Sequence, residues 1–83
     1  MDYFFTFRSV TAAMGSSRAL EQAGIKNQMV RTPTTLRQQG CGYSLRVSEG
    51  RLHESKQVLE EAGGRYQKIY RKEADGQWQE VSP

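Results

Sequence analysis

The amino-acid sequence predicts a single α+β domain with elements in the order β-α-β-β-α-β. Alternating apolar residues indicate strands at residues 3–7 and 43–47, and apolar residues three or four positions apart indicate two helices that end at glycines. Residues 20–24 and 59–63 also resemble each other, as two copies of a strand-helix-strand unit would. The alternative is chance, because any helix that ends at glycine before a strand has this appearance. We expect a ferredoxin-like fold, a four-stranded antiparallel sheet with two helices on one face.

The first half of the chain contains two strands, a helix and a loop. An aromatic strand over residues 3–7 is followed by Ser9, a favourable N-cap, and the apolar spacing then predicts a helix over residues 10–23. A second strand is expected over residues 25–32, where a proline follows. Residues 32–42 are polar and contain a proline and two glycines, which predicts a loop.

The second half repeats this pattern after the strand at residues 43–47. A second helix begins at Ser48 or Glu49 and ends at a pair of glycines, and a fourth strand follows over residues 66–71. We expect the domain to occupy residues 1–71 and residues 72–83 to form a tail. The tail contains a turn signal and a short run around a tryptophan, so it either folds back as an extra strand or stays loose.

The composition excludes several classes of protein. A chain of 83 residues leaves little core to enclose a deep catalytic pocket, so an elaborate enzyme is not expected. Its only cysteine excludes an intramolecular disulfide framework and a multi-cysteine metal site, which indicates a reducing compartment. The apolar stretch at the amino terminus is too short for a signal-peptide core, and no segment approaches the roughly 18 apolar residues of a membrane span. We expect a cytoplasmic protein without metal, cofactor or membrane partner.

One face of the predicted sheet is left uncovered by the helices. Alternation places the following side chains there: Phe4, Thr6, Ser44, Arg46, Tyr66, Lys68 and Tyr70. Aromatic rings beside cations suit RNA, because bases stack on rings and phosphates pair with cations. However, the RNA-recognition signature needs a basic residue where this chain has Gln39 and an aromatic residue where it has Cys41. We therefore do not expect a nucleic-acid partner. The alternative is burial of these rings against a second subunit, as a homodimer, or against the tail around Trp78.

Cys41 is the candidate reactive residue. It lies between Gly40 and Gly42, outside the apolar periodicity of the predicted elements, although free cysteines are usually buried in packing positions. The two glycines leave room for a partner to approach the thiol. They could equally form a simple turn in which a small cysteine is tolerated.

Chemistry at Cys41 would require a thiolate, which nearby positive charge favours. Arg37 precedes it on the loop and Arg46 follows on the next strand, while Arg31 ends the strand before. His53 is expected to be a solvated residue of the second helix, so a Cys-His pair is not predicted. Metal binding is not predicted either, because no second cysteine is available as a soft ligand.

Several short motifs follow one another in a recognisable order. These are Tyr-Phe-Phe-Thr-Phe, the helix end Leu-Glu-Gln-Ala-Gly-Ile, Arg-Thr-Pro, Cys-Gly-Tyr-Ser-Leu-Arg and the second helix end Ala-Gly. Over residues 3–71 the chain resembles the selenium/sulfur carrier protein-like family of small bacterial proteins. The resemblance implies that Cys41 carries sulfur or selenium, with Gly42 as its motif partner. The chain departs from the resemblance at residues 37–40, where we would expect small serine-like residues.

The leading hypothesis is a small cytoplasmic carrier whose partners are donor and acceptor proteins for sulfur or selenium. The Cys41 thiolate would take the atom from a donor persulfide and pass it on, while Arg37 and Arg46 stabilise the anion and the flanking glycines give access and backbone donors. Such a protein exchanges atoms rather than turning over a substrate, so we do not expect an enzyme. Two alternatives stay open: a module that binds RNA or a protein partner on the uncovered sheet face, with Cys41 incidental, and a regulatory small-molecule domain that uses residues 32–40 and a subunit interface.

Overall fold

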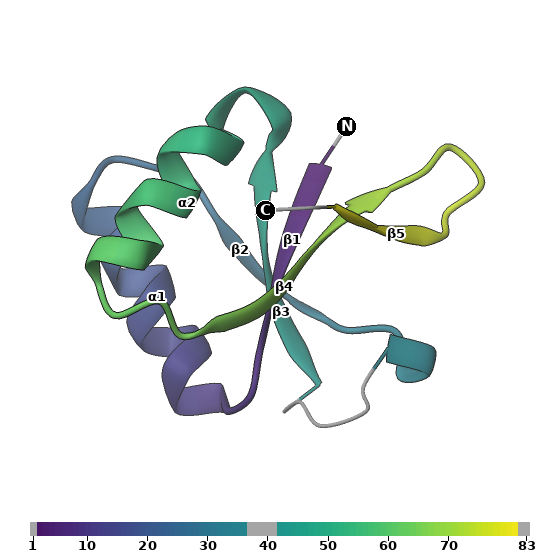
Figure 1. Cartoon of the computed structure of the whole chain (residues 1–83), viewed down its shortest axis with the longest axis horizontal. Helices are drawn as coiled ribbons and strands as arrows, with labels where there is room; N and C mark the ends of the chain where they lie inside the picture. Colours follow the sequence, from purple (N-terminus) through teal and green to yellow (C-terminus); the bar gives the residue numbers. More distant parts are fainter. Residues whose placement is uncertain (1, 37–41, 82–83) are drawn as a thin grey trace.

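The computed structural model describes residues 2–36 and 42–81 and shows a five-stranded antiparallel sheet with both helices on one side (Figure 1). The strand order is β2-β3-β1-β4-β5. The elements are β1 (Asp2–Phe7), α1 (Val10–Gln22), β2 (Gln28–Arg31), the single turn η1 (Thr34–Leu36), β3 (Tyr43–Ser48), the single turn η2 (Glu49–Arg51), α2 (Leu52–Glu61), β4 (Tyr66–Lys72) and β5 (Trp78–Val81).

The prediction of an α+β fold with two helices is confirmed, but the prediction of four strands is wrong. The tail folds back and adds β5 to β4, with Lys72 opposite Trp78 and Ile69 opposite Val81. The turn between the two strands is closed by the Glu73 N–H, which donates to the Gln77 carbonyl at 2.7 Å. This pairing gives the backbone of β4 hydrogen-bond partners on both sides, which is the physical reason for a fifth strand.

The core lies between the sheet and the helices. Apolar side chains of the three central strands face α1 and α2, as the alternation predicted for most of them. The buried cluster consists of Phe5, Phe7, Ala12, Ala13, Leu20, Ile25, Leu45, Val47, Leu59 and Ile69.

Both helices end in the same way, which explains the similarity of residues 20–24 and 59–63. In α1 the Ile25 N–H donates to the Leu20 carbonyl at 2.9 Å, across Gly24 with φ +76°. In α2 the Gly64 N–H donates to the Leu59 carbonyl at 2.9 Å. This bond across a left-handed residue is a Schellman ending, which glycine adopts without strain.

Alternation fails in β4, where an extra residue forms a bulge against β1. The register shifts between Phe5 and Phe7, and Phe7 lies opposite Tyr66. The Thr6 hydroxyl stabilises the bulge by accepting from the Lys68 N–H at 3.1 Å. As a result the Tyr66 ring lies on the helix side, edge-on to Phe5 at 5.1 Å, so its predicted place on the uncovered face is wrong.

The aromatic residues on the other face of the sheet are covered by the tail. Trp78 stacks on Phe4 with 4.0 Å between ring centroids and lies 6.0 Å from Tyr70. Phe4 and Tyr70 are therefore only 4% and 8% exposed. This confirms burial against the tail around Trp78, one of the two alternatives, while the homodimer stays a prediction.

Candidate functional site

Four strands meet at one end of the sheet, which we call the loop end. β1 and β2 finish here at Phe7 and Arg31, and β3 and β4 start here at Tyr43 and Tyr66. The antiparallel pairing of neighbouring strands places these four positions together. The chain segment that contains Cys41 joins β2 to β3 at this end, and α1 starts just after β1 (Figure 1).

Three of the five predicted site residues, Arg37, Gly40 and Cys41, lie outside the described residues. Gly42, the residue after Cys41, is described and is buried. Its φ is +85°, a conformation in which an L side chain is strained, so a glycine fits here for a backbone reason. Its carbonyl accepts a hydrogen bond from the Thr32 N–H at 2.8 Å. The residue after Cys41 is thereby fixed to the end of β2.

The other side of the loop is also anchored. The Leu36 N–H donates to the Pro33 carbonyl at 2.9 Å, which forms the single turn η1. The Thr32 side chain is buried and its hydroxyl shares a hydrogen bond with the buried hydroxyl of Ser44 on β3. The polar loop therefore starts and ends on the sheet at well-defined points.

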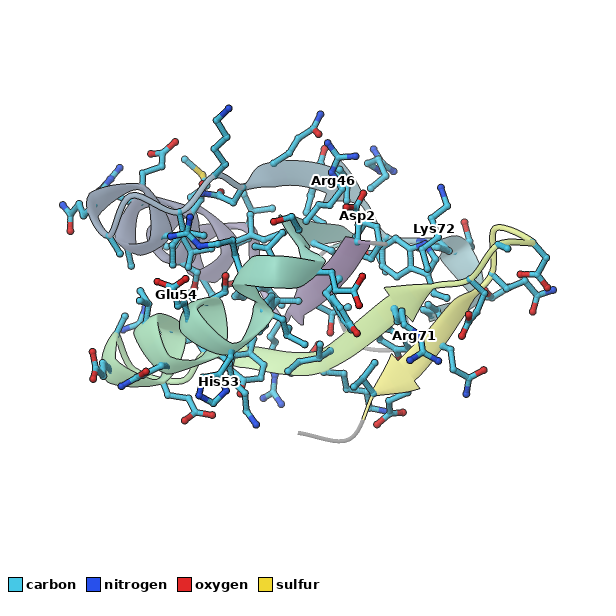
Figure 2. All side chains as sticks on the ribbon, turned by 90° about the horizontal axis from the view of Figure 1, so that it is seen from above. Asp2, Arg46, His53, Glu54, Arg71 and Lys72 are labelled. Carbon is cyan, nitrogen blue, oxygen red and sulfur yellow. The ribbon has the colours of Figure 1, made fainter. Side chains whose placement is uncertain are left out.

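Arg46 does not lie at the loop end. Its guanidinium pairs with the Asp2 carboxylate at 3.3 Å and donates to the side-chain carbonyl of Gln28, and Figure 2 shows it beside Asp2. Arg46 is four residues beyond Gly42 on β3, which corresponds to about 13 Å along a strand. The role of Arg46 as an anion stabiliser for Cys41 stays a prediction, now with these two partners in competition.

Arg31 does lie at the loop end. Its guanidinium carbon is 5.2 Å from the centre of the Tyr43 ring, the arrangement of a cation-π contact. Arg31 is exposed and lies opposite Tyr43, the first residue of β3. Tyr43 is two positions after Cys41 in the sequence. His53 is exposed on α2, as expected for a solvated residue, and Figure 2 shows its ring on the outer side of that helix.

A groove of about 710 Å³ opens at the loop end, which we call the loop-end groove. Its described walls include three cationic residues, Arg8, Arg65 and Lys68, together with Leu36 of η1. The sequence interpretation did not single out Arg8 or Arg65. The available signal was their position, because one directly follows β1 and the other directly precedes β4, and antiparallel neighbours bring those ends together.

Tyr66 also borders the loop-end groove, and its phenol is held in the neutral form. Burial raises the pKa of Tyr66 to about 12, and a hydrogen bond to Glu60 and the negative charge of Glu60 act in the same direction. The phenol donates to the Glu60 carboxylate at 2.9 Å. At neutral pH this wall of the groove therefore presents an aromatic ring and adds no charge.

Within residues 2–36 and 42–81, no three metal-ligating side chains gather into a group that could hold a metal ion. No helix in this part of the chain is long and apolar enough to cross a membrane.

The chain is a small α+β protein whose only cysteine belongs to the segment between β2 and β3, two strands that meet at the loop end of the sheet. The family described as "Putative Se/S carrier protein-like" matches residues 2–71, and the chain belongs to this family. The match stops before β5, which begins at Trp78. No curated protein and no solved structure matches the chain, so its ferredoxin-like classification stays a prediction.

Proposed function

We propose that this protein carries sulfur or selenium on Cys41. The observation that carries the proposal is the family match over residues 2–71, which includes the only cysteine of the chain. A carrier of one atom needs one thiol. Supporting this, the residues on both sides of the cysteine-bearing loop are anchored to the sheet, Gly42 by its bond to the Thr32 N–H and Thr32 by its side-chain bond to Ser44 on β3.

The proposed transfer is an exchange between thiols and persulfides. The Cys41 thiolate attacks the outer sulfur of a donor persulfide, R–S–SH, and the bond between the two donor sulfurs breaks. The products are Cys41–S–SH and the donor thiolate, R–S⁻, so atoms, charge and electrons balance without another reactant. An acceptor thiolate then removes the outer sulfur by the same reaction. The selenium version has selenium in place of the outer sulfur.

Positive charge at the loop end supports the thiolate that this reaction needs. Arg31 lies at the end of β2, and Arg8 and Arg65 flank β1 and β4 at the same end of the sheet. Cations favour a thiolate over a thiol and attract anionic donor groups. The competing role as a binding module on the uncovered sheet face loses support, because Phe4 and Tyr70 are buried against Trp78.

The test is to load the protein with a cysteine desulfurase and cysteine, remove small molecules, and measure the intact mass. We expect the wild type to gain the mass of one sulfur and the Cys41→Ser variant to gain nothing. Selenocysteine in place of cysteine examines the selenium version in the same way. An unmodified wild type with both donors, or an equal adduct on Cys41→Ser, would overturn the proposal. Circular dichroism of the serine variant verifies that it is folded.

A further inference from the structure

The loop-end groove has the size and the composition of a small-molecule site. Its volume of about 710 Å³ lies within the range of roughly 300–1,000 Å³ that is usual for such sites. Among its described lining residues are three cations and five hydroxyl groups, and there is no Asp or Glu. A groove with this lining favours a ligand that carries negative charge.

Two of the three cations have no acidic partner within the described part of the chain. Lys68 pairs with Glu80 on β5 at 3.5 Å. Arg8 and Arg65 are exposed and form no ion pair with the described residues. The groove therefore presents two guanidinium groups whose positive charge is not balanced by the described residues around it.

The start of α1 adds to this positive potential. Ser9 lines the groove and is the N-cap, and its hydroxyl accepts from the Ala12 N–H at 3.1 Å. The first turn of α1 contains no acidic residue. The positive end of the helix dipole thus lies beside the two arginines without a carboxylate to offset it.

Part of the groove wall is apolar and aromatic. Leu36 and Ala12 contribute aliphatic surface, and the half-buried Tyr66 contributes ring surface on the helix side, whereas Tyr70 faces the other side of the sheet and is mostly covered there by Trp78. The Tyr66 phenol is neutral and donates to Glu60, so the tyrosine provides its ring to the groove rather than a charge. This wall suits the organic part of a ligand, particularly a flat one.

We propose that the loop-end groove binds a small organic phosphate ester, with the phosphate between Arg8 and Arg65 and the organic part against the aromatic wall. A phosphate monoester carries a charge of about −1.5 to −2 at neutral pH, which matches two guanidinium groups better than a single carboxylate does. Guanidinium groups also bind phosphate oxygens in a two-pronged geometry. This site goes beyond the carrier role and does not involve the Cys41 thiol.

The test uses calorimetric titration of the full chain at constant ionic strength with adenosine monophosphate, phenyl phosphate, inorganic phosphate and benzoate. We expect one of the two phosphate esters to bind more tightly than inorganic phosphate and benzoate. The Arg8→Gln/Arg65→Gln double variant should bind it at least tenfold more weakly. Lys26→Gln/Lys56→Gln removes the same charge and should bind as the wild type does, because neither lysine lines the groove and Lys26 lies near the opposite end of the sheet, with Asp2 and Arg46.

The proposal is overturned if neither ester binds, if inorganic phosphate or benzoate binds as tightly as the esters, or if the control variant loses as much affinity as the arginine variant. Cys41→Ser separates this site from the carrier role. It should keep full affinity for the ester while it loses the sulfur adduct, so either proposal can fail while the other stands.

Discussion

Gly42 combines a special backbone conformation with a position next to the reactive candidate. Its φ is +85°, and its carbonyl accepts a hydrogen bond from the Thr32 N–H. The backbone conformation of Gly42 therefore sets the direction in which the chain enters β3. The sequence suggested that this glycine gives partners access to the thiol. The structure adds a second reason, because any L residue here would be strained.

Replacing Gly42 by alanine should therefore lower the free energy of unfolding by about 1 kcal/mol, because alanine is disfavoured at positive φ. Urea denaturation followed by circular dichroism measures the change. Gly15→Ala is the matched control, because Gly15 lies inside α1 and a methyl group at this position would have nothing within 4 Å. That substitution should raise stability by about 0.5–1 kcal/mol. A loss at both positions, or at neither, contradicts the backbone explanation.

Tyr66 provides a prediction about pH. Its folded pKa of about 12 is above the ordinary value of 10.0, so the folded state holds this proton more tightly than the unfolded state does. The stability that this provides is complete below the unfolded pKa and is lost as the pH rises from 10 to about 12. Tyr66→Phe should show a smaller fall in stability across this window.

The measurement is urea denaturation at several pH values, together with an absorbance titration of tyrosinate. The difference between wild type and Tyr66→Phe isolates this phenol from the other three tyrosines. Tyr70→Phe is the control, and equal pH profiles for all three proteins would refute the prediction.

At the scale of elements, the bulge in β4 depends on one hydroxyl. Thr6 Oγ1 accepts from the Lys68 N–H at 3.1 Å and lies 3.4 Å from the Lys68 carbonyl oxygen. Thr6→Val keeps the shape of the side chain and leaves this amide without its partner, so it should lower the free energy of unfolding by about 1–3 kcal/mol. Thr6→Ser keeps the hydroxyl and should lose clearly less. Chemical denaturation measures the free energy of unfolding of the two variants. Equal losses of stability would show that Thr6 acts through packing and not through its hydroxyl.

The same bulge shows why alternation along the sequence did not place every side chain on the correct face of the sheet. Alternation correctly identified Phe5, Phe7, Leu45, Val47 and Ile69 as core residues, because every second residue of a regular strand shares a face. The extra residue in β4 reverses the side for Tyr66, and it depends on a contact with Thr6 from a distant part of the chain. Local patterns do not contain such long-range contacts.

Helix ends were easier to predict than strand ends. Glycines after α1 and α2 indicated where each helix stops, and both helices end in Schellman contacts across a glycine. The second strand was expected over residues 25–32, but only Gln28–Arg31 pair with β3. Ile25 is instead held by the ending of α1, where its side chain is buried in the core.

For the molecule as a whole, the candidate site could be predicted only in part. Cys41 could be singled out as a candidate because it is the only cysteine and stands outside the apolar pattern, and its role stays a prediction. Arg8 and Arg65 were not, because they are far apart in the sequence and meet only through the pairing of β1 with β4. Arg46 appeared close in sequence, yet the extended strand carries it toward Asp2.

The coverage of the sheet by β5 leads to a prediction for the whole chain. A chain that ends at Lys72 loses Trp78, so Phe4 and Tyr70 become exposed together with the backbone edge of β4. We expect the shortened chain to be less stable and to self-associate in sedimentation experiments, more strongly than the full chain does.

Trp78→Ala in the full chain separates the ring from the strand. It should lower the free energy of unfolding by about 2 kcal/mol, less than a fully buried tryptophan would, because Trp78 is only half-buried. Gln79→Ala, at an exposed position of the same strand, is the control. A shortened chain that is as stable and as dispersed as the full chain would show that β5 does not protect this face.

The hydrogen bond between Thr32 and Gly42 also has an evolutionary consequence. Pairing of β2 with β3 already brings these two residues together, so the sheet determines the loop closure and the loop sequence does not. The entropic cost of such a loop grows only with the logarithm of its length, about 0.6 kcal/mol for each doubling. Apart from Cys41, on which the proposed carrier role depends, residues between the two anchors can therefore be substituted or inserted while the domain keeps its fold.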